Sequence, residues 1–146
     1  MSAMSDYLES GIIDHFLRGQ TLSKHGNLSI ALCSGVPIDA NTGGNIPEIQ
    51  GDHTGTAYIR KSLGAPGNTY FSIPSGTVTP TTTNVSAIEF AQATADWGHV
   101  SGVALVDATG WGLGNVLLYG QLTTTRIVTN GDIFRFNAGD IDISMA

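Results

Sequence analysis

The sequence predicts a mainly β fold, an antiparallel sandwich or jelly-roll-like arrangement with one short N-terminal helix and long loops. Three observations support this prediction. Short runs of alternating apolar and polar residues recur at intervals of about eight to twelve residues, with turn residues between them. The 146 residues include 19 glycines and five prolines. Helical periodicity is confined to the beginning of the chain. This length suits one domain with one core, spanning residues 1–146.

The helix is predicted over residues 5–18. Ser5 or Asp6 can cap its start, and Gly19 can cap its end. An apolar stripe repeats at helical spacing and consists of Leu8, Ile12, Ile13, Phe16 and Leu17. We expect this stripe to pack against a sheet or against a neighbouring subunit.

Alternating apolar residues predict the strands, and most of these strands lie in 84–146. The Asn130-Gly131 pair suits a tight primed turn, so residues 125–139 are predicted to form a hairpin. The closing stretch 140–146 would place Ile141, Ile143 and Met145 on one face. The other segments predicted as strands are 27–35, 56–63, 84–90, 98–107 and 115–122.

Residues 37–80 differ from the rest because all five prolines lie there, among glycine pairs and turn dipeptides. Their apolar residues follow no regular pattern, so a sandwich core would not easily accommodate them all. We therefore predict long loops or an arm that contacts other subunits. The predicted contact residues, with one tryptophan from a later glycine-rich loop, are Ile46, Ile49, Tyr70, Phe71, Ile73 and Trp111.

Composition excludes several classes of function. The net charge is −6 and only 12% of the residues are charged, with no cluster of cations, so nucleic-acid binding is not expected. No segment has the length of a membrane span or the pattern of a signal peptide, so we expect no membrane contact and synthesis in a cytoplasm. The single cysteine, Cys33, lies in an apolar run and is expected to be a small buried residue.

Residues 93–107 contain Asp96, His99, Ser101 and Asp107, which are the residue types of a hydrolase. On a strand, however, His99 and Ser101 would lie about 7 Å apart. That separation exceeds the contact of about 3 Å that activates a nucleophile. A better interpretation is a core strand in which Asp96 caps a turn, and no catalytic residue is predicted.

Cofactor and metal sites are not expected either. The four histidines, at positions 15, 25, 53 and 99, do not stand at metal-ligand spacing, although His53 lies in a loop. Asp140 and Asp142 could share a cation, but two carboxylates alone are a weak signal. Glycines 110, 112 and 114 are typical of a phosphate loop, yet no helix or lysine follows them.

Three segments carry a family resemblance: MSDYLESGIIDHFLRGQT followed by LSIALCSGVPID, then EFAQATADWGHVSGVALVDA, then GNVLLYGQLTTTRIVTNGDIFRFNAGDIDI. They resemble a family of small virion structural proteins of tailed bacteriophages, whose members are often labelled tail fibre proteins. The resemblance spans both ends of the chain and leaves about 37–84 unmatched. It implies a component of the virion, assembled in the host cytoplasm, and it assigns no catalytic residue.

Within this class we favour a capsid cement, or decoration, protein because the chain lacks repeats, an extended β-helix and a coiled coil. Its expected partners are the major capsid protein and other copies of itself, as a dimer or trimer. The alternative is a tail fibre, baseplate or other tail-associated protein. A third hypothesis is a carbohydrate-binding module, which would require Tyr70, Trp97 and Trp111 to form an exposed aromatic platform.

Overall fold

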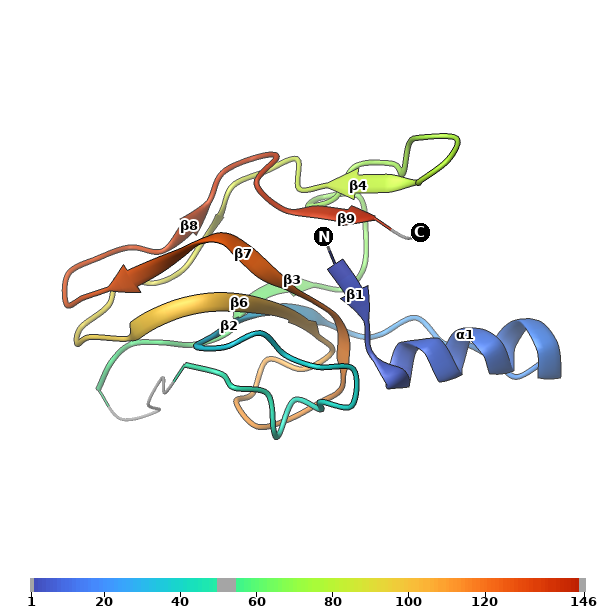
Figure 1. Cartoon of the computed structure of the whole chain (residues 1–146), viewed down its shortest axis with the longest axis horizontal. Coiled ribbons are helices and arrows are strands. Elements are labelled where there is room, and N and C mark those ends of the chain that lie inside the picture. Colours follow the sequence, from blue (N-terminus) through green and yellow to red (C-terminus); the bar gives the residue numbers. More distant parts are fainter. Residues whose placement is uncertain (1, 50–54, 145–146) are drawn as a thin grey trace.

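The protein is built around one five-stranded antiparallel sheet (Figure 1). The structure, a computed structural model, describes residues 2–49 and 55–144. The strands of this sheet, in spatial order, are β1 (Ser2–Met4), β7 (Val116–Val128), β6 (Gly98–Val106), β2 (Leu28–Cys33) and β3 (Lys61–Gly64). Two short antiparallel ladders join β4 (Thr81–Thr83) to β9 (Asp142–Ser144) and β5 (Ile88–Glu89) to β8 (Arg135–Phe136). This mainly β, sandwich-like arrangement with one helix confirms the predicted fold class.

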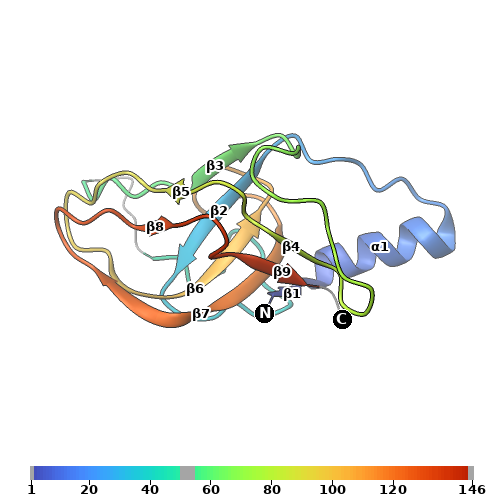
Figure 2. The same cartoon turned by 90° about the horizontal axis from the view of Figure 1, so that it is seen from above.

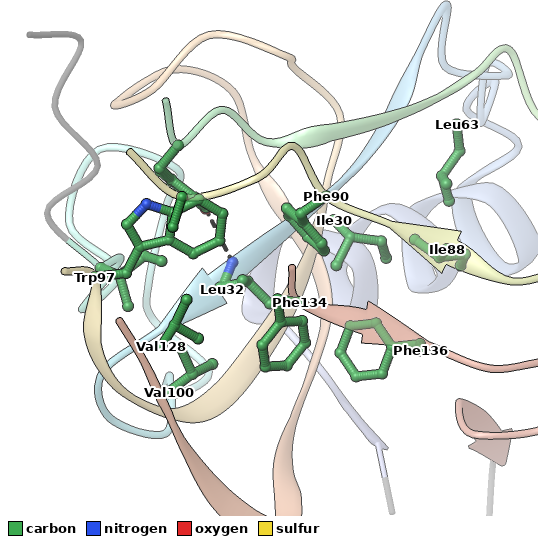
Figure 3. Packing of buried hydrophobic residues seen from close by; sticks show 13 residues of the cluster. Ile30, Leu32, Leu63, Ile88, Phe90, Trp97, Val100, Val128, Phe134 and Phe136 are labelled. Atoms are coloured by element: carbon green, nitrogen blue, oxygen red, sulfur yellow. Dashed lines mark hydrogen bonds between the residues drawn. The ribbon is translucent and has the colours of Figure 1, made fainter. Parts of the chain in front are cut away.

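Both faces of the central sheet are covered, because residues of β2 alternate between two hydrophobic cores. Ile30 and Leu32 point into the first core, whereas Ala31 and Cys33 point into the second. The first core lies between the sheet and the β5–β8 ladder (Figure 3). Its other buried members are Ile49, Tyr58, Leu63, Ile88, Phe90, Ala93, Trp97, Val100, Val128, Phe134 and Phe136.

The second core is smaller and lies under the loop that follows β2. It contains Ile46 from this loop, together with Ala104, Val106 and Val116 from β6 and β7. The loop approaches the sheet closely at a glycine of β6, which has no side chain to separate the two backbones. At Gly102, an added Cβ would lie only 2.4 Å from the Gly35 carbonyl oxygen.

A buried ion pair fixes the loops around this second core. Arg60 is 3% exposed, and its guanidinium donates to both carboxylate oxygens of Glu48 at 2.8–3.2 Å. The same group donates to the carbonyl oxygens of Gly43, Ala108 and Leu113. One side chain thus joins the loop after β2 to the loop between β6 and β7.

The N-terminal helix α1 (Asp6–Arg18) forms as predicted. Ser5 caps it: its buried hydroxyl accepts from the Leu8 N–H at 3.3 Å and donates to the Val116 carbonyl of β7. Gly19 ends the helix in the left-handed conformation with φ 68°. The apolar stripe was expected to pack against a sheet or against a neighbouring subunit, and over most of the helix the sheet of its own chain is not that partner. The helix touches β1 and β7 near its start and then projects from the body (Figures 1 and 2), and none of residues 6–18 is buried.

Several predicted strands differ from those observed. The hairpin predicted over 125–139 does not form, because β8 pairs with β5 rather than with β7. Only Gly131 of the Asn130-Gly131 pair has a positive φ, 93°, whereas a type I′ turn requires positive φ at both residues. The strand predicted at 56–63 is observed at 61–64, that at 84–90 shortens to 88–89, and that at 115–122 extends to 128. β1 and β4 were not predicted, and Met145 lies outside the described residues.

Candidate contact surface

The four residues with hydrolase chemistry do not assemble into one site. Asp96 accepts from the Asn130 N–H at 2.8 Å, as expected of a turn cap. Ser101 Oγ donates to the Ser34 carbonyl oxygen at 2.7 Å, and His99 lies exposed on β6. Asp107 accepts from the Asn115 N–H at 2.6 Å, at the turn between β6 and β7. Each of these hydrogen bonds joins neighbouring segments of the fold.

The structure pairs Asp107 with a histidine that the sequence did not connect to it. His25 Nδ1 lies 3.4 Å from Asp107 Oδ2, and the His25 ring stands 6.2 Å from that of Tyr7. These contacts join α1 and the segment after it to the end of β6. Nothing local in the sequence predicts this pair, because 82 positions separate the two residues and only the fold brings them together.

The titratable side chains of the described residues do not gather into a metal site. Within residues 2–49 and 55–144 no group of three or more His, Cys, Asp or Glu could hold a metal ion; His53 lies outside these ranges. Asp140 accepts from the Asn137 N–H at 2.7 Å and closes a turn. Burial raises the pKa of the Cys33 thiol to about 12, so the thiol stays protonated at neutral pH.

The predicted contact residues fall into three environments. Ile46 and Ile49 are 8% and 1% exposed and belong to the two cores, so their prediction as contact residues is wrong for the folded chain. The cores accommodate them because the loop after β2 packs Ile46 against the second core and then reaches β2, where the Ile49 N–H donates to the Leu32 carbonyl oxygen at 3.0 Å and its side chain enters the first core. Tyr70 and Phe71 are partly buried against the first core. Ile73 is 86% exposed, and Trp111 is 48% exposed.

The most exposed apolar side chains lie on two projections at one end of the molecule. The first is the outer part of α1, where Phe16 and Leu17 are 76% and 79% exposed. The second is the loop before β4, where Ile73 and Val78 are 86% and 91% exposed. In both views the helix and this loop extend to the same side of the sheet (Figures 1 and 2). The helix stripe and Ile73 were predicted from the sequence, whereas Val78 was not.

A cavity of about 150 Å³ lies between the central sheet and β9. Phe71, Val103, Leu105, Leu122 and Ile141 give it an apolar wall, and Asp140 and Asp142 also line it. It is open to solvent and lies beside the first core, under the C-terminal strand.

The aromatic platform expected of a carbohydrate-binding module is not assembled. Trp97 is only 6% exposed in the first core, where its Nε1 donates to the Thr56 carbonyl oxygen at 2.8 Å. Tyr70 is partly buried, which leaves Trp111 as the most exposed of the three rings. The part of the chain that the structure describes also contains no helix long and apolar enough to cross a membrane.

These features define a class, a small β-sandwich-like domain that displays apolar side chains on a projecting helix and loop. The chain matches, over residues 3–144, the family described as Podophage GP4 fiber I protein gp80, and it belongs to that family. It is therefore a virion structural protein of a bacteriophage, as the resemblance implied. The match also covers 37–84, which the quoted motifs did not reach. No curated protein matches the chain.

Proposed function

We propose that this protein is a tail fibre subunit, or another tail-associated subunit, that acts through protein contacts rather than catalysis. It is made and assembled into the particle in the host cytoplasm, and it associates there with other copies of itself. The observation that carries the proposal is the match to a fibre protein family along almost the whole chain. The exposed apolar residues of α1 and of the loop before β4 support a role in assembly, since such side chains commonly mark contact sites.

A capsid cement role, in contact with the major capsid protein, is the second candidate. A compact domain without sequence repeats favours it, because a long fibre shaft is usually built from repeated or extended elements. The two roles differ in location and copy number, and both use the surface rather than a pocket.

The experiment is electron microscopy of the virion with an antibody against this protein, combined with quantitative mass spectrometry of purified particles. The tail proposal predicts label at the tail and roughly six to a few dozen copies per particle. Label over the shell with hundreds of copies would overturn it in favour of cement. Particles assembled without the protein provide the control for specific labelling.

A further inference from the structure

Part of β7 has no ladder partner on either side. β1 pairs with β7 only as far as Gly120. On the other side, the ladder with β6 passes directly from Gln121 to Arg126. Residues 122–125 belong to β7 but pair with no other strand of the described residues. Extended backbone of this kind presents N–H and C=O groups that a further strand can pair with.

The same stretch borders the apolar cavity under β9. Leu122 lines this cavity and packs against the first core, whereas Thr123, Thr124 and Thr125 are exposed. Charged side chains and prolines commonly protect exposed strand edges, and residues 121–125 contain neither. β9 lies beside β1 (Figure 1), and β4 is its only ladder partner among the described residues. The groove between β7 and β9 is therefore open where β1 ends.

We propose that this groove receives an extended segment of a neighbouring virion protein, which adds antiparallel to β7 at residues 121–125. β1 already adds to the outer edge of β7 in this way, so the new ladder continues an existing one. This contact is additional to those of α1 and of the loop before β4. It is compatible with a place at the tail or on the shell, so label over the shell would leave it standing.

The side chains around the groove specify the chemistry of the segment. Residues directly opposite each other in an antiparallel pair point to the same face. The residue opposite Leu122 would therefore point into the cavity, which Ile141 and Ile143 also line, and an apolar side chain suits it. Its neighbours would point to the outer face, where Asp142 is exposed and forms no ion pair with the described residues. A basic side chain complements this carboxylate, so the segment alternates apolar and basic residues.

NMR of the isotope-labelled protein tests the ladder, with the end-blocked peptide Val-Lys-Val-Lys-Val as the probe. We expect amide shifts within 118–125 and 140–144 and slower amide exchange at 122–125. The same peptide with methylated backbone nitrogens should bind at least about tenfold more weakly, because it cannot donate hydrogen bonds to the β7 carbonyls. Equal binding of the two peptides would mean that the cavity accepts an apolar side chain without a ladder, and it would overturn the proposal. Failure of the unmodified peptide to bind, or shifts confined to another surface, would do the same.

An exchange of charge tests the basic residue of the segment. The peptide Val-Glu-Val-Glu-Val should bind at least about threefold more weakly than the lysine peptide, and Asp142→Lys should remove this preference. The matched control is Asp14→Lys, which makes the same change of charge on the projecting part of α1, where the Asp14 side chain is 42% exposed. It should leave the preference intact. An equal effect of the two variants would reduce the preference to net charge and contradict the role of Asp142.

The free protein distinguishes a foreign segment from a second copy. If two copies paired through this edge, the amides of 122–125 would exchange more slowly as the protein concentration rises, without any peptide. Such protection would assign the groove to self-association and overturn the proposal. We expect fast exchange of these amides at every concentration of the free protein, since their groups then bond only to water.

Discussion

At the scale of single residues, Arg60 illustrates how a buried charge stabilises the fold only through its partners. Its Glu48 partner and three carbonyl oxygens compensate for the cost of removing the guanidinium from water. We expect Arg60→Ala to lower the free energy of unfolding by about 3–5 kcal/mol, because Glu48 would remain buried without its counter-ion. Urea denaturation measures this loss.

The control is Arg135→Ala. Arg135 and Glu89 lie 3.6 Å apart, and both side chains are about half exposed, so removing this pair should cost less than about 1 kcal/mol. Equal losses in the two variants would contradict the structural role assigned to Arg60.

Cys33 offers a second measurement at this scale. Its thiol is fully buried, burial raises its pKa to about 12, and the nearby Glu48 carboxylate acts in the same direction. A thiol-specific reagent should therefore fail to react with the native protein at neutral pH and react fully after unfolding. Rapid modification of the folded protein would contradict this burial.

The residue scale also shows what sequence could not reveal. Cys33 was expected to be buried, because it lies within an apolar, alternating strand, and its exposed fraction is zero. Ile46 and Ile49 were misjudged because their segment has no period, and only the path of the loop decides that they face the sheet. Glu48 lies in a segment without a regular pattern and Arg60 lies in a predicted strand, and nothing local indicated that these two charged residues meet in the interior.

At the scale of elements, α1 forms from local signals, and the outer residues of its apolar stripe, Ile13, Phe16 and Leu17, are exposed in the single chain. Phe16→Ala should change the free energy of unfolding by less than about 0.5 kcal/mol in dilute protein, since Phe16 is 76% exposed. Phe134→Ala is the matched comparison, and it should cost about 3–5 kcal/mol because Phe134 is 3% exposed. A large loss for Phe16→Ala at low concentration would mean that the helix packs on its own body.

The contact between β6 and the loop after β2 depends on a glycine. Gly102→Ala would bring a methyl group within 2.4 Å of the Gly35 carbonyl oxygen, and we expect a loss of about 1–3 kcal/mol from overpacking. Gly67→Ala, where the nearest atom would be 3.8 Å away, should have little effect. Thermal unfolding of both variants provides the comparison, and similar melting temperatures would argue against close packing at Gly102.

Prediction of the elements succeeded where the pattern was local. Capping residues and a four-residue spacing located α1, and alternation located β2 and β6. The Asn130-Gly131 hairpin failed because the chain leaves the sheet after β7 and pairs β8 with β5 instead. Turn preferences report which conformations two residues can adopt, but they do not report which distant strand will form the ladder.

At the scale of the whole molecule, Asn84 links the middle of the chain to its last strand. Its buried amide accepts from the Ile141 N–H at 2.8 Å and donates to the carbonyl oxygens of Asn137 and Ser86 at 2.7 and 2.9 Å. Asn84→Ala should lower the free energy of unfolding by about 2 kcal/mol or more, because these backbone groups lose their partner.

Hydrogen exchange locates the effect of that change. Amides of residues 137–144 should exchange faster in Asn84→Ala than in the native protein, while those of β2 and β6 should change less. Ser86→Ala is the control, since the Ser86 hydroxyl makes one exposed hydrogen bond of 3.5 Å to the Thr69 carbonyl oxygen. Uniform acceleration along the chain would show that Asn84 supports the entire fold rather than the C-terminal ladder.

The order of strands in the central sheet has a consequence for how the chain acquires its structure. β1 pairs with β7, β2 with β6, β4 with β9 and β5 with β8, so most ladders must close long stretches of intervening chain. Closing such stretches costs entropy before any ladder forms, and proteins of this kind refold in milliseconds to seconds rather than microseconds. During synthesis, β2 leaves the ribosome about 70 residues before the end of its partner β6. The backbone groups of β2 that pair with β6 therefore remain unpaired during that time. Nascent chains would be most prone to aggregate in that interval.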